Sequence, residues 1–322
     1  MKATAVAHPM QALIKYHGLK DWTLRIPYHD SVSVNIDVLW TKTTVEFGDF
    51  DSDSIIINGR KPDNHSFHRC LSVINRVREL SGITEKVKVT SVNSLKLGSV
   101  KGLGFSSSAG AALAAAAFRA AGLHRKFGWD LKLISRIARR LAGSACRSVV
   151  GEYARWYAGK GDASSFASKI GTKRDLDMAM ILVPLGSEIE TEEAHRDATT
   201  SPFFRSRVRS ANKRTETIQT AIQKGDLKKV GELAEMDSLE LHGVTMTGRR
   251  GLIIYRPESI FVMNEVRKMR ERGKEVYFSM QTGPSVFINT YPDLEKEVSE
   301  AIQGLGLKTM TSRVGDEVRI VS

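Results

Sequence analysis

The sequence predicts an α+β fold in which antiparallel sheets are covered by helices. Residues 31–36 and 86–92 alternate between apolar and polar side chains, which is typical of strands with one buried face. Residues 64–80 place apolar side chains at helical spacing, so an amphipathic helix is expected there. Near the end of the chain, Gly283-Pro284 separates two apolar runs and indicates a turn between strands.

The first half of the chain begins with strands and continues with helices. Strands are expected at 3–8 and 10–14 on either side of Pro9, at 31–36, 41–47 and 54–60, and at 86–92. Asn58-Gly59 is a hairpin-type turn signal. Helices are expected at 64–80, at 109–121, and within 130–158, where Gly143 separates two helical stretches.

Composition distinguishes two of these helices. Residues 109–121 are almost all Ala and Leu, which predicts a closely packed helix in the domain centre. The next helix carries Arg136, Arg139 and Arg140, which are expected on solvated helix faces.

The second half begins at a buried-type strand over residues 177–185. We place the domain boundary just before it, so the predicted domains are residues 1–175 and 176–322. The later elements are a helical region at 201–248 interrupted at Gly225 and Gly243, a helix at 258–273, strands within 275–291, a helix at 294–305 and a terminal strand at 317–321.

Composition restricts the class of protein and of ligand. Within 322 residues, 41% are hydrophobic and 26% are charged, which is ordinary for a globular protein. The formal charge of +12 indicates a polyanionic partner, such as nucleic acid or a substrate with several phosphates. Cys70 and Cys146 form neither a disulfide framework nor a metal-binding spacing. We therefore expect no metal site. The sequence has neither a signal-peptide core nor an apolar run of about 20 residues, so the expected location is the cytoplasm, without membrane contact.

Two stretches carry the chemistry that the sequence suggests. Residues 101–110 form a glycine- and serine-rich loop that leads into a helix, whose free N–H groups favour an anion. The predicted phosphate-binding residues are Gly104, Ser106, Ser107 and Ser108. In residues 141–151, Arg147 follows small side chains, as a clamp for a buried carboxylate or phosphate would require.

These stretches and several others resemble the diphosphomevalonate decarboxylases of the GHMP kinase superfamily. The resemblance follows the chain in order, through ALIKYHG, IPYHDSVSV, SVNSL, GFSSSAG, GSACRS, GDASSFA, MDSLELH and TGPSV. GSACRS matches the family's most distinctive string without change. The resemblance implies a two-domain GHMP-type fold, with an N-terminal domain like ribosomal S5 domain 2 and a ferredoxin-like C-terminal domain. It also implies an active site in the cleft between them. Many relatives form homodimers, so a homodimer is one expectation for this chain.

The resemblance implies roles for individual residues. Arg147 would hold the carboxylate that leaves as carbon dioxide, and Ser144 would contact the same substrate. Lys15 and Tyr16 correspond to family residues near the 5-phosphate group, and Lys20 stands one residue after the position of a family lysine.

Two departures from the family pattern bear on the reaction. Leu19 stands at the position of that lysine, and Gln281 replaces an aspartate that is a proposed base at the 3-hydroxyl. A glutamine accepts no proton and a leucine neutralises no charge, so phosphorylation of a 3-hydroxyl loses two of its usual groups.

Three interpretations of the activity remain. The leading one is ATP-independent conversion of mevalonate 3,5-bisphosphate into isopentenyl phosphate, phosphate and carbon dioxide, with no cofactor. The second is a mevalonate 3-kinase. The third is an ATP-dependent decarboxylase of mevalonate 5-diphosphate or 5-phosphate in isoprenoid biosynthesis, which would use ATP and Mg²⁺, with Lys20 and Asp21 or Asp30 in the missing roles.

An RNA-binding module is a remote alternative from another class. The pI near 9.7 suits a polyanion. However, basic and acidic residues are mixed along the chain without an aromatic-interleaved stripe, so we expect a phosphorylated small molecule and no nucleic acid.

Overall fold

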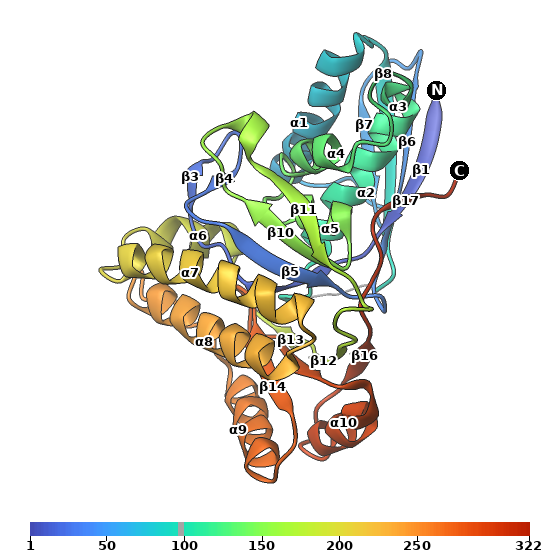
Figure 1. The fold of residues 1–322 in the computed structure, drawn as a ribbon. Helices are drawn as coiled ribbons and strands as arrows, with labels where there is room; N and C mark the ends of the chain where they lie inside the picture. The colour runs from blue at the N-terminus through green and yellow to red at the C-terminus, as the bar shows by residue number, and fades with distance from the viewer. Residues whose placement is uncertain (96–99) are drawn as a thin grey trace.

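The computed structural model describes residues 1–95 and 100–322, and its first sheet joins the two ends of the chain (Figure 1). The strand order is β17 (Arg319–Ile320), β1 (Lys2–Ala7), β6 (Thr41–Gly48), β8 (Lys86–Asn93) and β7 (Ser54–Ile57). Because β17 pairs with β1, the C-terminal segment returns to the N-terminal half. The β7–β8 pair is parallel, with α1 (Asn64–Ser81) as its crossover. The hairpin-type turn at Asn58-Gly59 is confirmed, because both φ angles are positive and Ile57 and Arg60 exchange backbone hydrogen bonds at 2.8 Å and 3.0 Å. A helix rather than a second long strand follows this turn.

A second sheet and a layer of helices complete the N-terminal half. The sheet has the order β11 (Phe166–Gly171), β10 (Tyr153–Tyr157), β5 (Ser31–Asn35) and β2 (Met10–Ile14). The helices are α2 (Phe105–Ala120), α3 (Leu123–Phe127), α4 (Leu131–Ala138) and α5 (Ala145–Val150). Helix α2 packs on β1 and β6, and α4 and α5 pack on β11, so these three helices lie between the two sheets. All alanines of α2 except Ala109 are buried in this layer, as their composition predicts.

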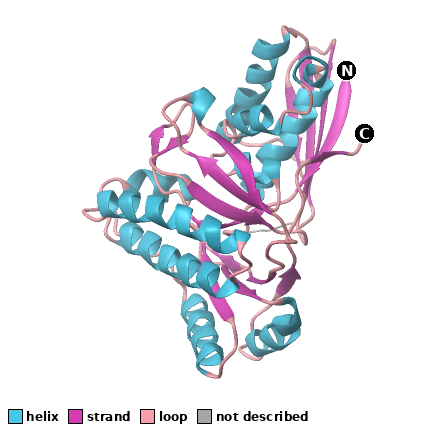
Figure 2. Ribbon diagram, in the orientation of Figure 1, coloured by secondary structure: helices cyan, strands magenta, loops and turns pink. Residues whose placement is uncertain are grey.

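The C-terminal half is built on a third antiparallel sheet (Figure 2). Its order is β14 (Val276–Met280), β15 (Val286–Thr290), β12 (Ala179–Val183) and β16 (Met310–Ser312). The helices of this half are α6 (Thr191–Ala198), α7 (Phe204–Gln223), α8 (Leu227–Met246), α9 (Pro257–Glu271) and α10 (Glu295–Gln303). Helices α9 and α10 share a hydrophobic core with one face of the sheet. The smaller elements are β3 (Leu19–Asp21), β4 (Ile26–Pro27), β9 (Val100–Lys101), β13 (Leu185–Gly186), η1 (Asp162–Ser164) and η2 (Pro292–Leu294).

One hydrophobic core joins the two halves. Side chains of β2 and β5 from the N-terminal half pack with α7, α8 and the other face of the third sheet. Leu13 and Val34 lie in this core beside Leu182 and Ile218, and all four side chains are inaccessible to solvent. The arrangement therefore presents the C-terminal end of β2 directly to α8.

The predicted break at Gly225 is confirmed, because helix α7 ends before this glycine, whose φ of +69° suits a left-handed turn. Two other details differ from the sequence-based predictions. The predicted break at Gly243 is wrong, because α8 continues to Met246. The prediction of a solvated face is wrong for Arg139, which is 0% exposed and bonds Asp162 and the carbonyl of Ser165.

Across the described ranges, every helix is too short or too polar to cross a bilayer.

Two glycines of α8 test how the helix packs on the third sheet. A Cβ at Gly231 would lie 2.1 Å from the Tyr277 ring, whereas a Cβ at Gly243 would meet nothing within 4 Å. We expect Gly231→Ala to lower the free energy of unfolding by about 1–3 kcal/mol through overpacking. The matched Gly243→Ala should raise it by about 0.5–1 kcal/mol, because alanine favours the helix. Urea denaturation checks both values, and equal effects of the two substitutions would contradict this packing.

Candidate active site

A cavity of about 380 Å³ is lined by residues from both halves of the chain. From the N-terminal half come Met10, Ala12, Lys15, Tyr16, Arg25, Arg69, Gly102, Leu103, Gly104, Phe105, Ser106, Ala142, Gly143, Ser144 and Arg147. From the C-terminal half come Glu190, Thr191, Glu192, His195, Gln281 and Thr282. Most of the predicted site residues therefore meet in one place.

Arg147 is the least compensated charge on this wall. It lies on α5, is 0% exposed, and none of its three guanidinium nitrogens bonds any described residue. Burial lowers the pKa of Arg147 below its ordinary value, but a guanidinium remains protonated in a protein. A buried cation without an anion is costly, so the geometry calls for an anionic ligand at this guanidinium.

Aromatic rings hold the guanidinium in position. Its carbon lies 5.8 Å from the ring centre of Tyr16 and 5.9 Å from that of Trp156. The two rings contact each other edge to face, with centres 5.0 Å apart. Ser144 precedes α5 and lines the same cavity as Arg147.

The serine loop divides its side chains between the cavity and the interior. Gly104 has a φ of +80°, and a Cβ there would lie 2.7 Å from the Met10 carbonyl oxygen, so only glycine fits. Gly104 and Ser106 line the cavity at the N-terminus of α2. The Ser107 hydroxyl bonds Gly104 O and Met10 N, and the Ser108 hydroxyl bonds Thr41 and Phe105 O. These last two serines therefore support the loop from behind.

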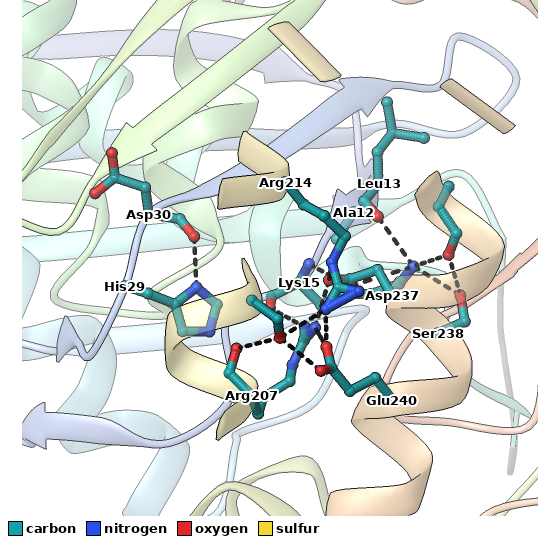
Figure 3. Close-up of polar contacts among 12 residues, drawn as sticks. Ala12, Leu13, Lys15, His29, Asp30, Arg207, Arg214, Asp237, Ser238 and Glu240 are labelled. Atoms are coloured by element: carbon teal, nitrogen blue, oxygen red, sulfur yellow. Dashed lines mark hydrogen bonds and ion pairs between the residues drawn. The ribbon is translucent and has the colours of Figure 1, made fainter. Parts of the chain in front are cut away.

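Lys15 is held by the protein itself, as Figure 3 shows. Its ammonium lies 2.8–3.2 Å from four acceptors, Leu13 O, Ala234 O and the hydroxyls of Ser238 and Ser279, which share its three hydrogens. Burial lowers the pKa of Lys15 to about 7, against the opposing effect of the Asp237 carboxylate. The ammonium therefore joins β2 to α8 and β14.

The Lys15 backbone is clamped by a buried ion pair (Figure 3). Asp237 accepts its N–H at 2.9 Å, and Arg207 donates to its carbonyl at 2.8 Å. Arg207 and Asp237 also bond each other at 2.5 Å, and both side chains are 0% exposed. Glu240 joins this cluster by pairing with Arg207 and Arg214. The clamp sets the direction in which Tyr16 enters the cavity.

A second cationic region lies on another part of the wall. Arg25 and Arg69 both pair with Glu192 of α6, at 2.7 Å and 3.5 Å. Arg25 has a φ of +52°, which is strained for a residue with a side chain and is typical of functional positions. The sequence offers no signal for this strain or for the ion pairs.

Gln281 occupies the position where the resemblance expects an aspartate. Its amide nitrogen donates to Met10 O and Gly102 O at 3.3 Å and 3.0 Å, and its oxygen accepts the Ala12 N–H at 3.4 Å. This glutamine ties the third sheet to β2 and to the serine loop.

A smaller cavity of about 200 Å³ adjoins the first. The two share Arg69, Phe105 and Ser106, and the smaller one has mainly apolar walls. Its remaining lining comes from Thr43, Ile55, Ile57, Ser66, Cys70, Val89, Ser91, Asn93, Ala109, Leu113 and Leu141. An apolar space beside a helix N-terminus can receive a ring next to a phosphate.

Other predicted and missed residues complete the site. Lys20 lies outside both cavity linings, and its ammonium donates to Gly159 O at 2.6 Å. Arg25, Arg69 and His195 line the cavity but are absent from the sequence-based prediction, because no motif contains them. Within residues 1–95 and 100–322, no three His, Cys, Asp or Glu side chains cluster as metal ligands would.

Comparisons with known proteins place the chain among phosphorylated-mevalonate decarboxylases. The family model "Diphosphomevalonate decarboxylase-like N-terminal domain" matches residues 7–167, and "Mevalonate 5-diphosphate decarboxylase C-terminal domain" matches residues 189–313. The phosphomevalonate decarboxylase of Haloferax volcanii is 39% identical over 100% of this chain and 98% of its own length. The mevalonate 3,5-bisphosphate decarboxylase of Thermoplasma acidophilum is 27% identical over 89% of this chain and 70% of its own.

Solved structures share the whole fold. The mevalonate diphosphate decarboxylase from Enterococcus faecalis, solved in work on mevalonate diphosphate mediated ATP binding, superposes with a TM-score of 0.91. It is 29% identical, and the match covers 100% of this chain and 99% of that one.

Two buried arginines test whether Arg147 is kept for a ligand. Arg139 and Arg147 are both 0% exposed, but Arg139 has protein partners. We expect Arg147→Met to leave the free energy of unfolding unchanged or to raise it by about 1–4 kcal/mol, because an uncompensated charge disappears. The matched Arg139→Met should lower it by about 1–3 kcal/mol, because it leaves polar partners unpaired. Chemical denaturation measures both, and a destabilised Arg147→Met protein would show that Arg147 serves the fold.

Proposed function

The chain belongs to the diphosphomevalonate decarboxylase family, and we propose that it is an ATP-dependent decarboxylase of mevalonate 5-phosphate. The products would be isopentenyl phosphate, carbon dioxide, ADP and phosphate. The observation that carries this proposal is the apolar cavity of about 200 Å³ that opens beside the serine loop. The end-to-end similarity to a phosphomevalonate decarboxylase supports the same substrate.

The two cavities suit the two substrates. A nucleoside in the smaller cavity would direct its phosphates past Ser106 toward the larger one, along the N-terminus of α2. When ATP binds with Mg²⁺, the ion usually takes one or two carboxylates together with the phosphates. Glu190 and Glu192 are the carboxylates on the cavity wall that would hold it.

The loss of an acidic residue at position 281 is compatible with phosphoryl transfer. The transition state of this reaction is largely dissociative, so positioning and electrostatic stabilisation contribute more than a base. Gln281 has a positioning role, because its side chain bonds the backbone of Ala12 and Gly102, and both residues line the cavity beside the serine loop. In this proposal the proton of the 3-hydroxyl passes to an oxygen of the transferred phosphoryl group, so the step needs no dedicated carboxylate.

Arg147 would then direct the decarboxylation. Two parallel N–H groups of a guanidinium bind a carboxylate in one plane and fix its orientation. With the carboxylate held, the 3-phosphate leaves, the bond to the carboxylate carbon breaks, and its electron pair forms the double bond. Arg25 and Arg69 would stabilise the negative charge of the substrate's phosphate groups.

ATP-independent cleavage of mevalonate 3,5-bisphosphate is the second candidate. The observation that favours it is Gln281, since a substrate already phosphorylated at C3 needs no base there. The same Arg147 clamp and the same product, isopentenyl phosphate, would serve this reaction.

Substrate comparison distinguishes the candidates. We expect the protein to release carbon dioxide, ADP and phosphate in equal amounts from mevalonate 5-phosphate and ATP, measured by coupled assay and mass spectrometry of the product. Turnover of mevalonate 3,5-bisphosphate without ATP, with none of mevalonate 5-phosphate with ATP, would contradict the proposal. Accumulation of a 3-phosphate without carbon dioxide would identify a kinase instead.

Ala109→Leu tests where the nucleotide binds, because Ala109 lines the smaller cavity and not the larger one. We expect the KM for ATP to rise by at least about tenfold, because the added volume excludes a ring from an apolar pocket. The KM for mevalonate 5-phosphate should stay unchanged. An unaltered KM for ATP would mean that the nucleotide binds elsewhere.

A further inference from the structure

His195 is a cavity residue with an unusual environment. It lies on α6, is 4% exposed, and belongs to the lining of the larger cavity. Its ring stacks on Tyr16 with centres 4.7 Å apart and planes 16° apart. This contact fixes the plane of the ring, so its two nitrogens point in defined directions.

The hydrogen bonds of His195 determine which nitrogen carries the proton. The Gly18 N–H donates to Nδ1 of His195 at 3.3 Å, so this nitrogen presents a lone pair. Nδ1 of His17 lies 3.1 Å from the same atom. Because two bare nitrogens repel each other, the hydrogen between them belongs to His17. A neutral His195 then carries its own hydrogen on Nε2.

The other side of His17 is consistent with this assignment. Its Nε2 lies 3.0 Å from the Thr245 hydroxyl on α8, and the same hydroxyl oxygen lies 2.9 Å from the Leu241 carbonyl oxygen. The hydroxyl has a single hydrogen, so this assignment requires that hydrogen to point at His17 rather than at Leu241 O. With the hydrogen on His17, a chain of donors runs from Thr245 through His17 to His195. It links α8 and α6 of the C-terminal half through a residue that follows β2.

Burial keeps both rings neutral at neutral pH. It lowers the pKa of His195 to about 4, with Glu192 opposing and Arg25 reinforcing the effect. It lowers the pKa of His17 well below its ordinary value, and the neighbouring His195 reinforces this. His195 is therefore a neutral donor, unlike the arginines of the cavity.

We infer that His195 is a substrate-binding residue that donates its Nε2–H to an anionic oxygen of the substrate, and that His17 is the positioning residue that holds this tautomer. Among the described residues, none bonds Nε2 of His195, while the ring lies on the cavity wall beside Arg25 and Glu192. Nε2 is open to the cavity, where a substrate oxygen can replace water as its acceptor. The identity of the substrate rests on the proposed function.

Binding measurements test the role of the side chain. His195→Phe keeps a ring against Tyr16 but has no N–H, so we expect the Kd of mevalonate 5-phosphate, measured by calorimetry, to rise by at least about tenfold. His195→Gln, whose amide still donates, should restore most of the affinity. His68→Phe, on the exposed face of α1, is the matched control and should leave Kd unchanged. In turnover assays the His195→Phe defect should appear in KM more than in kcat.

Nitrogen-15 NMR of histidine-labelled protein tests the tautomer without substrate. The signal that disappears in His195→Gln should show a protonated Nε2 and a bare Nδ1, and in His17→Phe it should shift toward a mixture of tautomers. A proton on Nδ1 of His195, an unchanged Kd in His195→Phe, or a wild-type protein that does not bind mevalonate 5-phosphate would overturn the inference. Absence of ATP-dependent turnover in a protein that passes these tests would contradict the proposed function alone.

Discussion

The Arg207–Asp237 ion pair around the Lys15 backbone is the constraint on which the site depends. It fixes a peptide unit at the end of β2, just where the chain enters the cavity as Tyr16 and His17. Breaking a buried pair of this kind leaves a charge without a partner, which is strongly unfavourable. The helices of the C-terminal half therefore hold a strand of the N-terminal half in one register. The Tyr16 ring in turn packs against the rings of Trp156 and His195. By fixing the backbone before Tyr16, the ion pair therefore also positions the aromatic contacts of the cavity wall.

A second constraint is the charge that the fold leaves uncompensated. Most buried arginines of the described chain, such as Arg139 and Arg207, have carboxylate partners, whereas Arg147 has none among the described residues. We propose that this arrangement lowers stability at one point and keeps a guanidinium available for a ligand. The cavity wall also contains Glu192, which occupies Arg25 and Arg69. The two cationic regions therefore differ: the Arg147 guanidinium has no partner among the described residues, whereas Arg25 and Arg69 are partly neutralised by Glu192.

Local patterns in the sequence predict elements and motifs well, but not the contacts between them. Composition and spacing alone predict the alanine-rich helix, the strand at 177–185 and the turn at Gly225. They do not predict the environments of Gly243 and Arg139, because a glycine in open space and a guanidinium beside Asp162 depend on tertiary surroundings. In the site, GSACRS pointed to Arg147. His195 and Arg25 come from segments without a motif, and only folding brings them to the cavity. Lys15 shows the converse, since a motif residue can turn its charge toward the protein interior.

The central claim is that the unpaired guanidinium of Arg147 receives the carboxylate of a phosphorylated mevalonate. A crystal structure of the complex with mevalonate 5-phosphate tests this most directly. We expect both carboxylate oxygens to lie within hydrogen-bond distance, about 2.7–2.9 Å, of Arg147 nitrogens. A carboxylate bound at Arg25 or Arg69, with Arg147 still lacking an anion, would contradict it.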